Sequence, residues 1–193
     1  FTVRKPAKIT KLLTACSLID YKGVDLAIKA IKGLPGVELT VAGAGVEASR
    51  LQSLIKQLRL GRRVKLLGWA AWHQLIQLAA KHHLFLHPSY TSADNKREGI
   101  PTSIIERAAS GMPIIATAHA DIPEIVKDGV NGYLVPEKDV EALAQKIKFL
   151  VKRPGLWPLM GRRGRELVEK NFDANKQTAK REVLYRQLVG KSA

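Results

Sequence analysis

Residues 84–116 read LFLHPSYTSADNKREGIPTSIIERAASGMPIIA and contain one complete strand–loop–helix–strand unit. The apolar run Leu84–His87 predicts a buried strand, and the stretch Thr102–Ser110 predicts a helix. A glycine and a proline then end the helix and introduce the next apolar run, Pro113–Ala116. Two buried strands joined through a helix are typical of a parallel sheet.

The same alternation continues in both directions along the chain. Further buried strands are expected at Ile9–Cys16, Val37–Ala42, Val64–Leu67 and Tyr133–Val135. Further helices are expected at Val24–Ile31, Ala48–Leu58, Trp72–Ala80, Ile122–Val126, Val140–Val151, Leu156–Lys170 and Ala174–Leu188. We therefore predict one α/β domain over residues 1–193, a Rossmann-like parallel sheet of about six strands with helices on both faces. Its core is expected over residues 9–171.

Length and composition suit an ordinary globular domain, with 193 residues of which 46% are hydrophobic. No apolar run approaches the ~18 residues of a membrane span, and the first residues carry charge instead of a signal-peptide core. Cys16 has no partner for an intrachain disulfide, so a reducing, cytoplasmic location is expected. The chain begins with phenylalanine, which we interpret as the start of a fragment or an excised domain.

The formal net charge of +15 is unevenly distributed. Residues 1–65 carry a net +9, residues 66–151 a net −1 and residues 152–193 a net +7. Such an excess favours anionic partners, namely phosphorylated ligands, anionic lipid or nucleic acid; a solvated surface is the plain alternative. Nucleic acid is not expected, because the sequence shows neither an aromatic–basic motif nor a known nucleic-acid fold.

An open parallel sheet binds ligands at the carboxyl ends of its strands, where loops meet helix N-termini. That rule selects the loops 17–23, 43–47, 68–72 and 88–101. The last loop ends in Glu-Gly-Ile-Pro and leads into a helix whose first turn suits Pro101. The free backbone N–H groups at this helix start form a plausible phosphate cradle, and they belong to Gly99, Ile100, Thr102 and Ser103.

Two glutamates, Glu98 and Glu106, flank this predicted cradle. A carboxylate repels phosphate but accepts hydrogen bonds from two adjacent sugar hydroxyls. Their arrangement therefore matches the layout of a nucleotide-sugar, in which a diphosphate lies between two sugars. The alternative is that Glu98 is a solvated loop residue and Glu106 a surface residue favoured by the helix dipole.

Longer motifs carry a resemblance to a known family. EGIPTSIIE has the spacing E-x7-E and continues in DIPEIVKDGVNGYLVP; DYKGVDLAIKAI, VELTVAGAGVEASRLQSLIKQLRL and VKLLGW precede it in order, and RPGLWPLMGRRGRELV follows. From Ile9 to Leu188 the chain resembles the C-terminal half of retaining GT-B glycosyltransferases of the GT4 family. It is most similar to bacterial exopolysaccharide enzymes of the colanic-acid and amylovoran type. The resemblance implies one half of a GT-B fold, with residues 172–193 as the helix that crosses to the other half.

The resemblance also implies roles for matched positions. Glu98 would contact the transferred sugar, Glu106 the ribose hydroxyls and Lys22 the diphosphate, with Glu98 and Lys22 as the catalytic residues. The remaining donor site would comprise Gly99, Ile100, Pro101, Thr102 and Ser103 at the sugar and diphosphate, Gly43 and Gly45 beside the nucleotide, and Leu67, Gly68 and Trp69 bordering the base. Neither a metal nor another cofactor is expected.

The sequence departs from the family pattern in two respects. Ser17 stands where the family usually has a phosphate-binding arginine, and a hydroxyl donates one hydrogen bond without carrying charge. Nothing here corresponds to the family's N-terminal domain, which holds the acceptor site and a catalytic histidine or aspartate. We therefore expect a donor-binding half that is inactive alone, in which Arg97 or another cation compensates for Ser17.

The resulting hypothesis is a domain that binds a UDP- or GDP-sugar for bacterial surface-polysaccharide synthesis and works with an acceptor domain outside this chain. One alternative is a non-catalytic nucleotide-sugar-binding or scaffold domain with a degraded diphosphate site. Another is a basic domain that binds anionic surfaces. A lipid-linked acceptor and a peripheral position at the inner face of the membrane are compatible with the first hypothesis.

Several remaining side chains have weaker interpretations. A metal site at His82, His83 and His87 is disfavoured, because no Cys, Asp or Glu is close in sequence. His119 follows a strand near the expected cleft, where it contacts phosphate or acceptor or, as we favour, lies at the surface. Cys16 ends a buried strand and is not expected to be a nucleophile.

The tryptophans and the last predicted helix also have more than one interpretation. Trp69 and Trp72 either flank the base or pack at a loop, whereas Trp157 is expected in core or hinge packing. The final predicted helix carries Val183, Leu184 and Leu188 at helical spacing. We expect this apolar stripe to be exposed here and to favour self-association.

Overall fold

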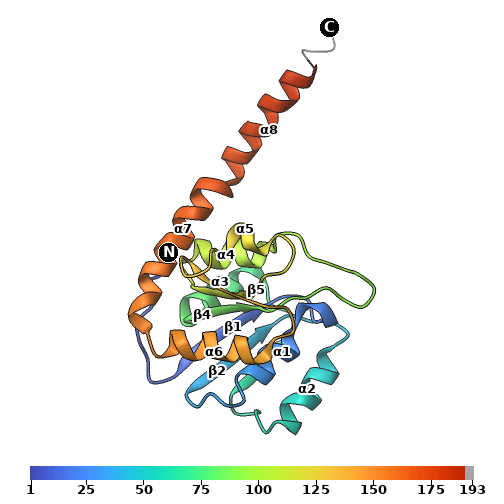
Figure 1. Cartoon of the computed structure of the whole chain (residues 1–193), viewed down its shortest axis with the longest axis vertical. Coiled ribbons are helices and arrows are strands. Elements are labelled where there is room, and N and C mark those ends of the chain that lie inside the picture. Colours follow the sequence, from blue (N-terminus) through green and yellow to red (C-terminus); the bar gives the residue numbers. More distant parts are fainter. Residues whose placement is uncertain (190–193) are drawn as a thin grey trace.

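The computed structural model describes residues 1–189 (Figure 1). Its strands are β1 (Thr10–Ala15), β2 (Val37–Ala42), β3 (Val64–Leu66), β4 (Leu84–His87), β5 (Ile114–Thr117) and β6 (Gly132–Val135). They form one sheet in the order β3-β2-β1-β4-β5-β6, and all neighbours are parallel. Strands β4 and β5 are buried at every residue, as expected for strands covered on both faces. The predicted Rossmann-like parallel sheet is confirmed.

Helices alternate with the strands as far as α6, and α7 and α8 follow α6 without a further strand. They are α1 (Val24–Ala30), α2 (Ala48–Gln57), α3 (Trp72–Lys81), α4 (Thr102–Ala109), α5 (Ile122–Ile125), α6 (Val140–Val151), α7 (Trp157–Asn171) and α8 (Ala174–Val189). Every predicted strand and helix is present, and each boundary lies within one residue of its expected position. The sequence did not predict two short 3-10 turns, at Asp20–Lys22 and Pro154–Leu156.

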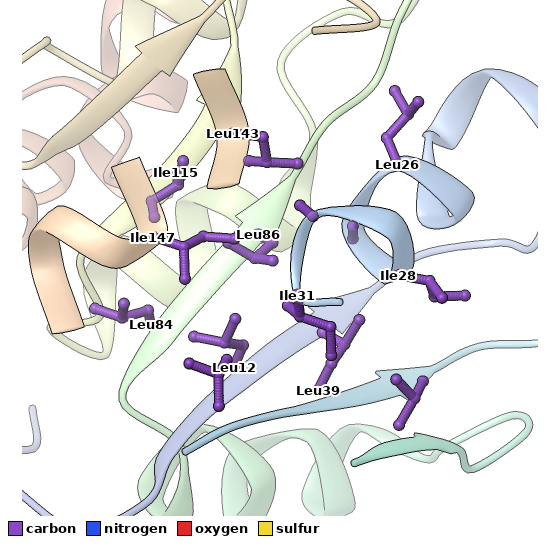
Figure 2. Close-up of a cluster of buried hydrophobic side chains, with 14 of the residues drawn as sticks. Leu12, Leu26, Ile28, Ile31, Leu39, Leu84, Leu86, Ile115, Leu143 and Ile147 are labelled. Carbon is purple, nitrogen blue, oxygen red and sulfur yellow. The ribbon is translucent and has the colours of Figure 1, made fainter. Parts of the chain in front are cut away.

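Two hydrophobic cores lie on the two faces of the sheet. Helices α1, α2 and α6 cover one face, and α3, α4 and α5 cover the other (Figure 1). Helix α7 contributes to both cores, with Trp157 and Met160 in the first and Val168 in the second. Figure 2 shows the first core, where Leu12 and Leu86 of the sheet meet Ile31, just after α1, and Ile147 of α6. Trp157 is also part of this core and is 1% exposed, so its predicted core packing is confirmed.

Helix α4 has well-defined ends. Pro101 lies at its N-cap, one residue before the first-turn position that the sequence suggested. At the other end Gly111 has φ +79°, its N–H donates to the carbonyl of Ala108 (2.9 Å), and the N–H of Met112 donates to Arg107 (3.0 Å). This pair of bonds is a Schellman motif, which explains the predicted stop.

Helix α8 leaves the body of the domain as a single rod (Figure 1). It has no buried residue, and Val183, Leu184 and Leu188 are each more than half exposed, as the sequence predicted. Residues 190–193 of the predicted C-terminal segment lie outside the described residues. Along residues 1–189, no helix combines the length and apolarity needed to cross a membrane.

Candidate functional site

The parallel sheet has two distinct edges. The strand-to-helix segments lie at one of them, here named the carboxyl edge: 16–23, 43–47, 67–71, 88–101, 118–121 and 136–139. The N-terminal segment, the helix-to-strand segments and the end of α6 lie at the other, the amino edge: 1–9, 31–36, 58–63, 82–83, 110–113, 126–131 and 152–156. From β1 the chain adds β2 and β3 on one side of the sheet and then β4, β5 and β6 on the other, so the strand order reverses between β1 and β4. Open α/β sheets bind ligands at such a switch point.

A cavity of about 290 Å³ opens at the carboxyl edge. Its lining comes from the ends of β1, β2 and β3 and from α3 and α4: Ala15, Cys16, Ser17, Ala42, Gly43, Ala44, Trp69, Ala70, Leu75, Thr102, Ser103 and Glu106. Six predicted site residues therefore share this cavity. The lining contains hydroxyl groups and one carboxylate, but no lysine or arginine.

The loops after β2 and β3 meet beside this cavity. The N–H of Gly43 donates to the carbonyl of Gly68 (2.7 Å) across an isolated bridge. Trp69 is 75% exposed and lies between the first cavity and a second one of about 280 Å³, which Leu67 also lines. Trp72 is exposed as well. The two tryptophans are thus not packed into the core, and the loop around Trp69 borders open space.

Close contacts with the backbone are enough to explain why positions 43 and 45, two of the predicted site positions, hold glycine. A Cβ on Gly43 would lie 1.8 Å from the carbonyl oxygen of Cys16, and one on Gly45 would lie 2.2 Å from that of Leu18. Gly99 differs, because a Cβ there would meet only the Asp121 carboxylate, at 4.0 Å. The fold therefore leaves free space beside Gly99, and this space is available to a ligand.

The start of α4 presents unpaired donors. Within residues 1–189, four backbone N–H groups around Pro101 donate no hydrogen bond to the protein; they belong to Gly99, Ile100, Thr102 and Ser103. One helical turn further on, the side chain of Glu106 is 41% exposed and pairs with Arg107 (2.8 Å). Arg107 is buried and bonded to the carbonyl of Leu75, so it holds Glu106 at the rim of the cavity.

Glu98 lies in a cluster of buried polar side chains. Its Oε2 pairs with Nζ of Lys22 at 2.7 Å, and its Oε1 accepts from His87 Nε2 at 3.0 Å and from the hydroxyl of Ser89. The side chains of Glu98 and Lys22 are only 5% and 17% exposed. The structure therefore brings the two predicted catalytic residues into direct contact with each other, beside the residues that line the cavity.

The pKa of Glu98 is lowered to about 2. Burial acts in the opposite direction, but it is outweighed by the hydrogen bond and charge of His87 and by the hydrogen bonds from Lys22 and Ser89. Glu98 is consequently ionised at neutral pH, and its oxygens act as acceptors.

His119 is buried, so its predicted surface position is wrong. Its Nε2 accepts the backbone N–H of Glu98 at 3.1 Å, and its Nδ1 must therefore carry the proton that is donated to Glu137 at 2.7 Å. Glu137 also accepts the N–H of Thr91 at 2.8 Å. Burial opposes the lowered pKa of Glu137, and the bonds from Thr91 and His119 cause it. This chain of contacts fixes both ends of the loop that carries Glu98.

The sequence did not reveal His87 and Ser89 as partners of Glu98, or Glu137 as the partner of His119. His119 and Glu137 follow β5 and β6 at the carboxyl edge. The rule that selected four loops there would have found both residues if it had been extended to the last two strands.

The remaining candidates have other roles. Burial raises the pKa of the Cys16 thiol to about 12, so the thiol is neutral at physiological pH and a poor nucleophile. His82 bonds to the carbonyl of Leu78 and to Thr40, and His83 accepts the N–H of Lys11. Along residues 1–189, no group of three or more His, Cys, Asp or Glu is arranged to hold a metal ion.

Comparison with known proteins identifies the class. Residues 2–167 match the sequence model of the family described as "Glycosyl transferases group 1". WcaL of Escherichia coli K12, named as a colanic acid biosynthesis glycosyltransferase, is 35% identical over 187 residues, which are 94% of this chain and 45% of WcaL. The chain therefore belongs to the group 1 glycosyltransferase family, and the predicted resemblance to exopolysaccharide enzymes is confirmed. It spans less than half the length of the curated relatives it matches.

Solved structures agree with this assignment. A sucrose-phosphate synthase from Thermosynechococcus elongatus superposes with a TM-score of 0.86 at 27% identity, over 97% of this chain and 47% of that one. Anabaena Alr3699/HepE, solved in complex with UDP and glucose, gives a TM-score of 0.81 at 25% identity, over 91% of this chain and 48% of that one. The domain thus has the Rossmann-like fold of one half of a GT-B glycosyltransferase.

Proposed function

We propose that this chain binds the nucleotide-sugar donor of a retaining, GT4-type hexosyltransferase of bacterial surface-polysaccharide synthesis. One observation carries the proposal: a cavity lined by the accessible carboxylate of Glu106 opens at the start of α4, where backbone N–H groups are unpaired, and the loop that leads into this helix carries the ionised Glu98. The complex of HepE with UDP and glucose supports a UDP-sugar as donor. A GDP-sugar is the alternative that the experiment below distinguishes.

In this proposal each part of the donor meets a different part of the site. The base borders the loop of Leu67, Gly68 and Trp69, and the ribose hydroxyls donate to Glu106. The diphosphate accepts from the N–H groups of Gly99, Ile100, Thr102 and Ser103, where the α4 dipole favours negative charge. The transferred sugar donates hydroxyl protons to Glu98.

The chemistry assigned to this half is stabilisation of the leaving group. The bond between C1 of the sugar and the diphosphate oxygen breaks, and its electron pair stays on that oxygen. The N-terminal N–H groups of α4 and the ammonium of Lys22 stabilise the developing charge. An acceptor oxygen forms the new bond to C1 on the same face and loses its proton to a base. We assign that base and the acceptor site to an acceptor half, so this chain alone is expected to be inactive.

Ser17 makes Lys22 the principal cation of the proposed site. Without donor, Lys22 is paired with Glu98, and Ser17 contributes only a hydroxyl to the cavity. A bound diphosphate competes with Glu98 for the ammonium of Lys22. Part of the attraction between the diphosphate and Lys22 therefore only offsets the loss of the Lys22–Glu98 pair. Donor affinity should therefore be lower than in a site that also has an arginine.

A second candidate function follows from the same observation. Because the cavity lining contains no lysine or arginine, the domain is alternatively a scaffold that no longer binds a nucleoside diphosphate. Titration calorimetry with UDP, GDP, ADP and their common sugar conjugates separates the two functions.

The calorimetry compares the wild type with Glu106→Gln and Lys22→Ala, and Glu166→Gln, on an exposed position of α7, is the matched control. We expect saturable binding of one nucleotide, weakened at least about tenfold by each site variant, since each removes a charge-assisted contact. The control should bind as the wild type does. If no nucleotide binds at millimolar concentration, the donor proposal fails and the scaffold function takes its place.

A further inference from the structure

The amino edge is strongly basic, although the donor site lies at the other edge. The amino-edge segments contain ten Lys or Arg and one Asp or Glu, a net of +9. The carboxyl-edge segments contain four and seven, a net of −3. Helix dipoles favour basic residues in the last turn of a helix, but most of these amino-edge charges lie beyond the last turn. The dipoles therefore do not account for them.

Eight of the ten amino-edge cations are exposed, and four of them are here named the basic face: Lys8, Lys32, Arg62 and Lys152. None of the four forms an ion pair with another described residue. Their charges repel one another, and they contribute no contact to the fold that would explain their clustering. An anionic partner outside the chain would supply the missing counter-charge.

Specific contacts bring the segments that carry these charges together. The guanidinium of Arg63 donates to the carbonyls of Ile31 (2.9 Å), Leu34 (2.8 Å) and Lys32 (2.8 Å), which joins segment 58–63 to segment 31–36. The N–H of Thr10 donates to Gly36 (2.8 Å), which attaches the N-terminal segment to the same place. Lys8, Lys32 and Arg62 thus lie on segments that are bonded to one another, and Lys152 at the end of α6 lies beside segment 31–36.

The same surface contains an aliphatic groove. A groove of about 300 Å³ lies between segment 31–36 and the end of α6, lined by Gly33, Leu34, Pro35, Val37, Lys148, Val151 and Lys152. Leu34 and Val37 are 9% and 1% exposed and form the floor of the groove, and Ile9 on the adjoining N-terminal segment is 39% exposed. Lysines around exposed aliphatic side chains are typical of surfaces that enter the headgroup region of a bilayer. A nucleic acid is bound through its phosphates and by stacking of its bases, and an aliphatic groove supports neither contact.

We propose that the basic face docks on a bilayer surface rich in anionic lipid, with the aliphatic groove at the lipid interface. In this orientation the carboxyl edge points away from the lipid, and its cavity stays open to the aqueous phase. The proposal goes beyond donor binding and does not depend on it.

Sedimentation with lipid vesicles tests the proposal. The chain is mixed with vesicles of phosphatidylcholine alone, or of phosphatidylcholine with phosphatidylglycerol, at about 0.1 M salt. The basic-face variant carries Lys8→Glu, Lys32→Glu, Arg62→Glu and Lys152→Glu. A control with the same change in net charge carries Arg162→Glu, Arg163→Glu, Lys170→Glu and Lys180→Glu, at exposed positions of α7 and α8. Circular dichroism establishes that both variants fold.

We expect the wild type to bind only the anionic vesicles and the basic-face variant to bind them at least about tenfold more weakly. The control should remain near the wild type. Equal losses in the two variants would mean that net charge acts without a defined surface, and would overturn the proposal. The proposal would also be overturned if the wild type did not bind anionic vesicles, or if the basic face were needed for binding a DNA duplex but not for binding vesicles. Nucleotide calorimetry on the same variants reports separately on the donor site.

Discussion

The two edges of this sheet hold their charges in opposite ways. At the carboxyl edge, the side chains of Glu98 and Lys22 are largely buried and paired with each other, and His87 and Ser89 also bond to Glu98. At the amino edge, the cations of the basic face are exposed and have no carboxylate partner among the described residues. Buried, paired charges are part of the fold and fix a geometry, whereas exposed, unpaired charges act on partners at a distance.

The largest expected effect comes from breaking the buried pair. Lys22→Met leaves the carboxylate of Glu98 without its ammonium, and we expect a loss of about 3 kcal/mol in the free energy of unfolding. The matched control is Lys96→Met, because Lys96 pairs with Asp94 at 2.6 Å and the two side chains are 66% and 59% exposed. It should lose far less, since exposed ion pairs contribute little to stability. Urea unfolding measures both, and equal losses would contradict the contrast between buried and exposed charges.

Acid should unfold the carboxyl edge through Glu98. Its folded pKa of about 2 is below the ordinary value of 4.5, so the unfolded chain takes up a proton first as the pH falls. The stabilisation is fully present above pH 4.5 and is lost as the pH falls towards 2, by about 3 kcal/mol in total. Glu98→Gln should flatten this part of the curve of unfolding free energy against pH. An unchanged slope in the variant would show that other carboxylates cause the acid sensitivity.

A smaller effect is expected at His119. His119→Ala leaves the N–H of Glu98 without an acceptor and removes one of the donors to Glu137, which should cost about 2 kcal/mol in unfolding free energy. His119→Gln keeps an acceptor and should lose less. Thermal unfolding ranks the two variants against the wild type. If alanine and glutamine are equally tolerated, the contact does not hold the Glu98 loop.

The smallest effect is expected at the amino edge, from His82 and His83. Burial lowers the pKa of both histidines, so the folded state disfavours their protonated forms. Stability should therefore fall as the pH drops below the ordinary value of 6.5, whereas the loss at Glu98 begins only near 4.5. The double variant His82→Gln, His83→Gln should abolish this step, namely the decrease in unfolding free energy that begins below pH 6.5. A step that persists in this variant would have to come from another histidine.

The fold could be predicted almost completely from the sequence, because its signals are local. Strands β4 and β5 are unbroken apolar runs, and Gly111 ends α4 through its own backbone conformation. Such signals need no knowledge of distant residues. The 3-10 turn Asp20–Lys22 was missed because it is too short to show a period.

The site was only partly predictable, because its contacts depend on the order of the strands. Lys22 follows β1 and Glu98 follows β4, and the two meet only because β1 and β4 are neighbours. His87 and Glu98 are eleven residues apart, and no periodic pattern shows that their loop folds back. His119 was assigned to the surface for the same reason, since its partners come from the ends of other strands.

One measurement tests the central claim most directly, namely that a nucleoside diphosphate binds at the carboxyl edge. Amide chemical shifts of the ¹⁵N-labelled chain are followed during titration with UDP, and with GDP and ADP in parallel. We predict saturable shifts at Gly43, Gly99 and Ser103 for one nucleotide, while Gly36 and Gly61 at the amino edge remain unchanged. Shifts that are confined to the amino edge, or no shifts with any of the three at millimolar concentration, would contradict the account.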